Sequence, residues 1–243
     1  MCPAPWRADE ERSTRPRIGS RRTTAPRALA RPSQQSRSAG AVRGPALPRG
    51  FYERPAPRVA RDLLGHVLIS RIGGRVTAGR IVETEAYLGP EDRASHAAFR
   101  PSSRWLFYGP GGIAYVFRAY GLNDCLNAIA GRRGTPGCVL IRALEPLTGI
   151  AYMAHRRRRA LPDGSVPALA ALTSGPGRLT RALGITPQTN GHDLRRWPLR
   201  IQGAKKSPRA TVRTSTRVGI TRSRRLRLRF SLRGNPFVSR LGG

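Results

Sequence analysis

Two runs rich in β-branched residues flank a Gly-Gly pair, and this arrangement most restricts the folds open to the chain. The first run is "HVLIS" at 66–70 and the second is "RVTAGRIVETEAY" at 75–87, with Gly73 and Gly74 between them. Short strand-like runs around a glycine turn predict an antiparallel hairpin. Because later strand-like runs do not alternate regularly with helices, we expect an α+β fold, one mixed domain around a largely antiparallel sheet. Those later runs are 112–121, 137–146, 199–203, 215–220 and 225–234.

Three segments have the features of short helices. They are 56–66, 146–159 and 174–185. The first has its apolar residues on one helical face and is followed by Gly65. The second places Pro146 at its start and arginines in its last turn, where cations suit the helix dipole. The third offers Ser174 as N-cap and Gly184 as C-cap.

Residues 1–46 form a segment rich in Arg, Pro, Ser and Ala that has little apolar periodicity. Such a sequence cannot bury enough apolar surface to offset the entropy lost on ordering. We therefore expect a disordered basic arm over 1–46 and a folded domain over 47–243. The arm has three interpretations: a segment that binds polyanions, a transit-like leader, and the product of a wrongly assigned start codon.

The charge balance points to a polyanionic partner. The chain has 45 Lys and Arg but 13 Asp and Glu, a formal net charge of +32. A field of this size attracts polyanions, so nucleic acid is the first candidate and an anionic membrane surface the second. After Asp193, fifteen basic residues follow without one acid. In "RLRLRF" at 225–230, arginines alternate with apolar residues, which at strand spacing predicts one packed face and one cationic face.

The three cysteines, Cys2, Cys125 and Cys138, show neither an even-numbered framework nor metal-ligand spacing. We expect no disulfide framework and no metal site, and a reducing compartment suits such a chain. No apolar run approaches the ~18 residues needed to cross a bilayer. The N-terminus also lacks the apolar core of a signal peptide.

Four of the thirteen acids lie within "ETEAYLGPEDRASH" at 83–96. Residues two apart in a strand share a face, so Glu83, Glu85 and Tyr87 are expected to project together. One interpretation is structural, with one exposed carboxylate and one paired with an arginine. The other is a general base beside an aromatic side chain in a cationic groove. The spacing alone favours the structural interpretation.

Five blocks, in order, resemble the alkyladenine family of DNA glycosylases, the 3-methyladenine DNA glycosylases. They are "RIVETEAYLGPEDRASH", "AYVFRAYGLNDCLN", "CVLIRALEPLTGI", "SGPGRLTRALGI" and "LRGNPFVS". The resemblance extends over roughly residues 47–243. It implies a single mixed domain whose curved, largely antiparallel sheet is flanked by short helices. It also implies excision of damaged purines from duplex DNA by base flipping, with no metal and no organic cofactor.

The resemblance implies roles for the reacting and DNA-opening residues. Glu85 is expected to be the general base that activates the water attacking C1′ of the flipped nucleotide. Arg142 is expected to help hold that water and the local phosphate. Tyr120 is expected to fill the gap left in the duplex, with Leu122 beside it. A backbone amide from 215–220 is expected to line the pocket.

The base pocket follows from the same resemblance. Tyr87 and His96 are expected on one wall and Phe117 on the other, and His96 is expected to contact the base edge or sugar phosphate. Asn127 is expected to clash with the 2-amino group of guanine and so to disfavour normal guanine. The family commonly has tyrosine where this chain has Phe117, which keeps the stacking but loses a hydroxyl contact.

The implied partner is duplex DNA that contains damaged purines, bound by a monomer without a membrane partner. The implied location is cytoplasmic and nucleoid-associated in a bacterium, and nuclear or organellar in a eukaryote. Two other classes stay open: a non-catalytic basic nucleic-acid-binding protein that retains the fold, and a ribosomal or RNA-packaging protein. The set of Glu85, Tyr87, His96, Asn127 and Arg142 favours an enzyme, because binding alone does not need it.

Overall fold

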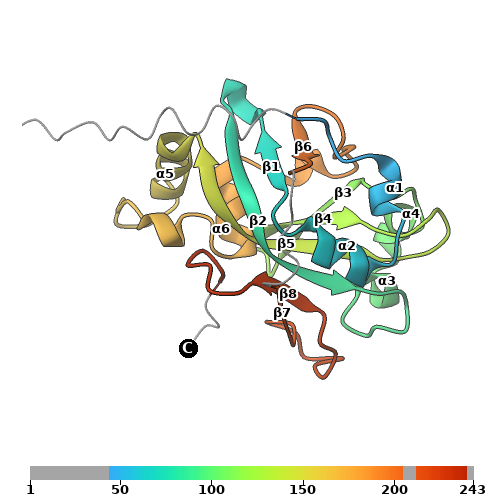
Figure 1. Ribbon diagram of the computed structural model, residues 1–243. Helices are drawn as coiled ribbons and strands as arrows, with labels where there is room; N and C mark the ends of the chain where they lie inside the picture. The colour runs from blue at the N-terminus through green and yellow to red at the C-terminus, as the bar shows by residue number, and fades with distance from the viewer. Residues whose placement is uncertain (1–43, 205–211, 240–243) are drawn as a thin grey trace, which may run out of the picture. The chain divides into compact units, whose positions relative to one another are not determined.

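The structure, a computed structural model, describes residues 44–204 and 212–239 (Figure 1). Its eight strands form one sheet, in which β3, β4, β5, β2, β1 and β6 are neighbours in that order and β8 joins β2 to β7. Each of these strand pairs is antiparallel. The strands are β1 Val67–Ser70, β2 Thr77–Tyr87, β3 Ala114–Ala119, β4 Asn123–Ile129, β5 Cys138–Thr148, β6 Leu199–Gln202, β7 Val212–Ser215 and β8 Arg229–Leu232.

Short helices pack against this sheet, which confirms the expected α+β fold. In Figure 1, α2 lies over β2 and β5, and it contacts both strands. Helix α6 packs on β4, β5 and α5. The α-helices are α1 Arg49–Tyr52, α2 Ala56–Leu63, α3 His96–Phe99, α4 Arg104–Phe107, α5 Ile150–Arg158 and α6 Pro176–Leu183. Short 3₁₀ turns are η1 Ile72–Gly74, η2 Pro101–Ser103, η3 Leu169–Ala171 and η4 Pro187–Thr189.

Strand β2 is central because it pairs with three other strands. Its residues 77–80 pair with β1, its residues 83–85 pair with β8, and β5 runs along it from 78 to 87. The hairpin between β1 and β2 is confirmed, with Gly73 and Gly74 in the turn at φ of 69° and 70°. Glycine suits this left-handed backbone because it has no Cβ. Figure 1 shows β2 as a long, bent ribbon, in keeping with the expected curvature.

The main apolar core lies where α2 and α6 meet the sheet. Val59 and Leu63 of α2, Ile141 of β5, and Leu179 and Leu183 of α6 are fully buried members of one cluster. Burying one such side chain stabilises the fold by about 1.5–3 kcal/mol. Helix α2 therefore holds β2 and β5 in place, and α6 holds β4 and β5.

The predicted helix over 146–159 begins later than expected. Pro146 lies within β5, and α5 starts at Ile150 after Gly149, whose φ is 74°. A side chain on Gly149 would collide with the carbonyl oxygen of Val76. Strand β4 pairs only with residues 138–140 of β5, so it does not reach as far as Pro146. The lack of an N–H on Pro146 therefore costs β4 no hydrogen bond.

Helix α6 is confirmed, but its predicted N-cap is wrong. Gly175 is the N-cap, because Ser174 forms a β-bridge with Ala143 and is engaged in the sheet. The C-cap prediction is confirmed: Gly184 is left-handed, with a φ of 73°.

The predicted strands near the C-terminus need correction. β7 ends at Ser215, so the predicted strand 215–220 is instead a loop. β8 is shorter than the predicted 225–234, and its two faces do not divide into apolar and cationic. Arg229 is buried and paired with Glu83, whereas Leu226 is 41% exposed. The buried carboxylate attracts an arginine inward, so the alternating pattern does not describe burial here.

Strand β4 was not predicted. Its first residues, Asn123 and Asp124, are polar, yet its residues 123–128 all pair with β3. At the other end of the sheet, the Leu47 N–H donates to Ile201 O (2.9 Å) and the Gly203 N–H donates to Pro45 O (3.2 Å). The chain is therefore joined to β6 from residue 45 onward. Residues 1–43 of the predicted arm lie outside the described residues.

Candidate active site

A β-bulge places Arg142 of β5 against the acidic face of β2. Thr84 pairs with Ile141 while Glu83 pairs with Ala143, so Arg142 is an extra residue between two paired positions. Bulges re-aim side chains and are common beside active sites. Glu83 and Glu85 share a face, as predicted, and both meet this guanidinium. Both carboxylates are fully buried, so neither is the exposed one of the structural interpretation.

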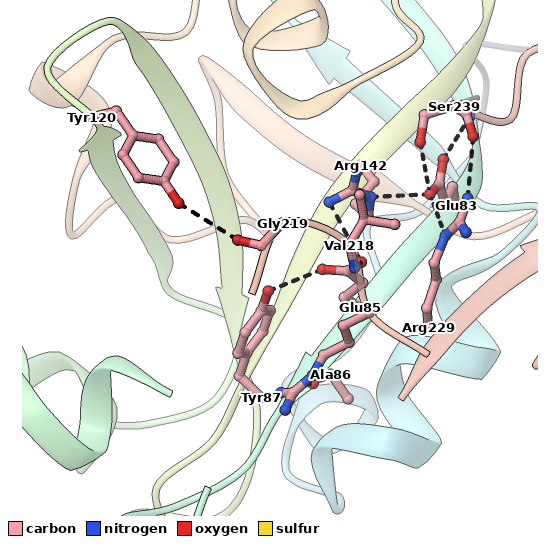
Figure 2. Close-up of polar contacts among 11 residues, drawn as sticks. Glu83, Glu85, Ala86, Tyr87, Tyr120, Arg142, Val218, Gly219, Arg229 and Ser239 are labelled. Carbon is pink, nitrogen blue, oxygen red and sulfur yellow. Dashed lines mark hydrogen bonds and ion pairs between the residues drawn. The ribbon is translucent and has the colours of Figure 1, made fainter. Parts of the chain in front are cut away.

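Glu83 is held by donors from three parts of the chain (Figure 2). Its Oε1 accepts hydrogen bonds from Arg142 Nε (3.0 Å), Arg229 Nε (2.7 Å) and Ser239 Oγ (2.9 Å). Its Oε2 accepts a fourth from the Ser239 backbone N–H (2.7 Å). With these bonds made, Glu83 serves to anchor Arg142 and the C-terminal segment.

Glu85 has fewer partners and faces the other side of Arg142. Its Oε1 accepts a 2.8 Å hydrogen bond from the Val218 N–H and lies 3.4 Å from Arg142 Nη1. Its Oε2 accepts a 2.9 Å hydrogen bond from the Tyr87 hydroxyl. Burial raises the pKa of Glu85 above its ordinary value, against the lowering effects of Arg142, the Val218 amide and Tyr87. A carboxylate with a raised pKa is a stronger base, as a general base requires.

An open cavity of about 810 Å³ lies next to this carboxylate. Glu85 is 0% exposed and does not line it, but three of its partners, Tyr87, Arg142 and Val218, do. Glu85 therefore lies directly behind the cavity wall. The cavity brings together six of the eight predicted site residues: Tyr87, His96, Phe117, Tyr120, Asn127 and Arg142.

The aromatic walls differ from the expected arrangement. The rings of His96 and Phe117 touch edge to face, with centroids 4.3 Å apart, so these two residues do not lie on opposite walls. Among the ring contacts of the described residues, none joins Tyr87 to either of them. Tyr87 instead has the guanidinium of Arg217 4.6 Å from its ring centroid. His96 therefore belongs with Phe117, and Tyr87 forms a separate part of the lining.

His96 is neutral at neutral pH. Burial, followed by the charge of Arg100, lowers the pKa of His96 to about 4. Its Nδ1 lies 2.6 Å from the Tyr115 hydroxyl, which accepts a 3.1 Å hydrogen bond from Ser103 Oγ. This short hydrogen bond holds the ring in place, and the tautomer of the imidazole decides which of the two groups donates.

Asn127 is buried and fixed on the floor of the cavity. Its Nδ2 donates to Tyr115 O (3.1 Å) and Cys125 O (3.4 Å). Its Oδ1 accepts a weak 3.8 Å contact from the Cys138 thiol. Because both ends of the amide are engaged, the side chain has little freedom to swing away from an entering base.

Tyr120 and Leu122 project from the turn between β3 and β4. They are 89% and 74% exposed, respectively, which is unusual for side chains with this much apolar surface. Tyr120 has a positive φ of 49°, and its hydroxyl donates a long 3.5 Å bond to Gly219 O (Figure 2). Tyr120 also lines the cavity. Leu122 shares the exposed turn, which suits the two residues to contact a large partner together.

Sequence reasoning missed the pair of Asp92 and Arg217. Arg217 Nη1 donates to Asp92 Oδ2 (2.6 Å) and Ala86 O (3.0 Å), and Nη2 donates to Asp92 Oδ1 (2.9 Å). This buried ion pair anchors the loop that carries Val218, which supplies the amide expected from 215–220. The acidic run at 83–96 was the signal that could have suggested a partner for Asp92.

The structure also bears on metals and membranes. Within 44–204 and 212–239, no three His, Cys, Asp or Glu residues gather as a metal ion would need. Cys125 and Cys138 are buried free thiols. No helix in the same part of the chain is long and apolar enough to cross a bilayer. The expected lack of a cofactor stays a prediction.

Comparison with known proteins gives a consistent match. Residues 50–236 match the profile of the family described as Methylpurine-DNA glycosylase (MPG). A protein of Methanoculleus marisnigri is 44% identical over 197 residues, which cover 80% of this chain and 98% of that relative. A protein of Chlorobium phaeobacteroides is 40% identical over 202 residues, covering 82% of this chain and 99% of the relative. Both carry the provisional name 3-methyladenine DNA glycosylase. The chain therefore belongs to the methylpurine-DNA glycosylase family.

Proposed function

We propose that this protein is a monofunctional DNA glycosylase of base-excision repair. Its substrates would be alkylated or deaminated purines in duplex DNA, of the 3-methyladenine, 7-methylguanine and hypoxanthine type. The observation that carries the proposal is the buried carboxylate of Glu85, which three donors hold directly behind an aromatic-lined cavity. Membership of the family and the names of the relatives support the same activity.

The cavity suits a purine turned out of the duplex. Extruding a base costs a few kcal/mol of stacking and pairing, and the cost is least for a damaged base. Tyr87, His96 and Phe117 offer aromatic surface to it. Alkylated purines carry positive charge, so they gain a cation–π attraction from these rings.

Glu85 would activate the attacking water. Each carboxylate oxygen accepts about two hydrogen bonds, and Oε2 accepts one, from Tyr87. A small shift of Tyr87 or of the Val218 loop would admit a water to the second position. The water oxygen bonds to C1′, its proton passes to Glu85, and the bond from C1′ to the purine nitrogen breaks with its electrons moving to the base.

The charge around Glu85 suits this step. The transition state resembles an oxocarbenium ion, so the carboxylate also faces developing positive charge. Arg142 favours the ionised form of Glu85, against the opposing effect of burial on its pKa, and offers Nη1 at the cavity wall. A positively charged alkylated base leaves as a neutral molecule, whereas hypoxanthine would take a proton from water.

Selection against normal guanine would fall to Asn127. Its side chain is buried and engaged at both ends, so it cannot yield to the 2-amino group of guanine. Adenine-derived bases and hypoxanthine lack that group and would meet no such clash. 7-Methylguanine carries the same 2-amino group, so its positive charge and its readiness to leave would have to outweigh the clash. Tyr120 and Leu122, both exposed, would fill the space that the extruded nucleotide leaves in the duplex.

One experiment tests the proposal directly. Duplexes carrying single 3-methyladenine, 7-methylguanine or hypoxanthine residues are incubated with the protein, then treated with alkali. We expect strand breaks at the lesion, which report abasic sites, and none in an undamaged duplex of the same sequence. Binding without any alkali-labile site would instead support the non-catalytic DNA-binding alternative, with which the complete burial of Glu85 in the free protein is also consistent.

A further inference from the structure

Four consecutive arginines, Arg156 to Arg159, lie at the end of helix α5, and one of them, Arg157, has a buried nitrogen without a partner among the described residues. Arg156 donates to the carbonyl oxygens of Ala182 (3.2 Å) and Ile72 (2.7 Å). Arg158 and Arg159 are exposed to solvent. Arg157 is only 7% exposed, and its Nε is buried without a hydrogen-bond partner among the described residues. The guanidinium of Arg157 therefore stands apart from its three neighbours.

A buried cation without a partner is costly. Removing a charged group from water costs several kcal/mol unless a counter-charge and hydrogen bonds replace the hydration. Within 44–204 and 212–239, no ion pair joins Arg157 to a carboxylate, and neither α5 nor α6 contains an acid. The Nε of Arg157 is thus enclosed with no acceptor in the described part of the chain, whereas Nη1 and Nη2 are not enclosed in this way and stay open to an external acceptor.

The surroundings make the charge imbalance larger. Helix α6, which packs on α5 (Figure 1), carries Arg178 and Arg181 one turn apart on its exposed side. After burial itself, the charges of these two arginines are what lower the pKa of Arg157. Three positive groups without an acid between them make a strong local field for an anion. A tetrahedral oxyanion accepts from several guanidinium donors at once.

Helix α6 also connects the three arginines to the cavity. Pro176, its first residue, lines the cavity wall. Thr180 Oγ1 donates to Asp124 O (2.9 Å) in β4, next to the turn that bears Tyr120 and Leu122. Arg181 is five residues after Pro176, a rise of roughly 7.5 Å along an α-helix. That rise is comparable to the spacing of successive phosphates on a DNA strand.

We propose that Arg157, together with Arg178 and Arg181, forms a phosphate-binding site between α5 and α6. A backbone phosphate of the DNA is the occupant, bound a short way from the nucleotide in the cavity. The DNA half of this inference rests on the proposed function, whereas the phosphate site itself does not. A free phosphate ion has the same chemistry, and the experiment below distinguishes a phosphate of DNA from free phosphate.

The test compares Arg157→Met with Arg159→Met. Both substitutions remove one positive charge and keep an unbranched side chain, but only Arg157→Met removes a guanidinium from the proposed site. The melting temperature is measured in sodium phosphate and in sodium chloride at equal ionic strength. We expect phosphate to raise the melting temperature of wild type and of Arg159→Met, because a ligand that binds only the folded state stabilises it.

Arg157→Met is expected to lose the phosphate response. In chloride it should melt at the wild-type temperature or above, because it no longer buries an unpaired charge. A merely structural Arg157 predicts the reverse: a lower melting temperature in chloride and an unchanged response to phosphate. That result would overturn the proposal.

The second arm uses an undamaged duplex, so it does not depend on excision. We expect Arg157→Met to bind the duplex roughly tenfold more weakly and to lose about 0.9 from the slope of log affinity against log salt, one phosphate contact. A lost phosphate response with an unchanged slope would reject DNA as the occupant and leave a site for free phosphate. If Arg157→Met loses both the phosphate response and the salt slope but the wild-type protein excises no base, the proposed function is refuted and the phosphate-binding site stands.

Discussion

Arg142 donates a 3.0 Å hydrogen bond from its Nε to Glu83, two residues before the carboxylate that faces the cavity wall. The same guanidinium then presents Nη1 to Glu85 at 3.4 Å. Because a guanidinium is planar and rigid, holding one nitrogen fixes the direction of the others. Glu83 thus positions Arg142, and the segment ending at Ser239 positions Glu83.

Glu83→Gln tests that chain of contacts. The amide keeps the shape but removes the charge that balances Arg142 and Arg229, both of which stay buried. Breaking one member of a buried ionic cluster costs about 3–5 kcal/mol, so urea unfolding should show a loss of that size. Glu145→Gln is the control, because its pair with Arg80 is partly exposed and should be worth less than about 1 kcal/mol. Equal stabilities of the two variants would argue against the anchoring role.

Glu85→Gln tests the general base. We expect the variant to bind lesion-containing duplex as wild type does and to excise the base roughly 10²–10⁴-fold more slowly, the usual contribution of such a group. Single-turnover excision and a separate binding assay distinguish the two steps. Glu91→Gln is a matched control on the exposed part of the same acidic run. An unchanged excision rate in Glu85→Gln would remove Glu85 from the mechanism.

Local patterns predicted a large part of this site. The period of a strand correctly placed Glu83, Glu85 and Tyr87 on one face, and the glycine signals correctly placed the β1–β2 turn. These predictions depend on residues close together in the sequence, where backbone geometry alone decides the outcome. The grouping of distant residues around one cavity came from resemblance to a family.

Contacts between distant segments were not predictable in the same way. The amide that bonds Glu85 belongs to Val218, 133 residues away, and Ser239 is 156 residues from Glu83. The bulge at Arg142 is a property of the pairing between β2 and β5. Such features depend on strand register, which is set by the packing of the whole sheet.

The pH dependence of stability should report the environment of Glu85. Burial raises its pKa above the ordinary 4.5, so the folded state holds this proton more tightly than the unfolded chain does. The wild type therefore loses stability as pH rises through the folded pKa, and Glu85→Gln, which cannot ionise, does not. We expect the variant to gain in stability relative to wild type as pH rises from about 4.5, the ordinary pKa, through the raised pKa of the folded state, measured by chemical unfolding. A stability difference between Glu85→Gln and wild type that stays constant as pH rises would contradict the assignment.

Asp92→Asn tests the anchor of the Val218 loop. Losing the carboxylate leaves Arg217 buried without its ion pair and frees the loop whose amide bonds Glu85. We expect the excision rate to fall by a larger factor than the affinity for DNA, because the loop orients Glu85, the proposed general base. Asp163→Asn changes a carboxylate in an exposed loop and should leave both quantities unchanged. If Asp92→Asn weakened binding and excision equally, the loop would act in DNA contact instead.

Tyr120→Ala tests the wedge. The side chain is almost fully exposed, so its removal should change the free energy of unfolding by no more than about 0.5 kcal/mol. A side chain that fills the gap in a duplex has no such gap to fill in a single strand. We therefore expect excision from a paired lesion to fall far more than excision of the same lesion from single-stranded DNA. Tyr152→Ala removes an exposed tyrosine from α5 and serves as the control. An equal loss on paired and single-stranded substrates would show that Tyr120 contacts the nucleotide itself and does not replace it in the stack.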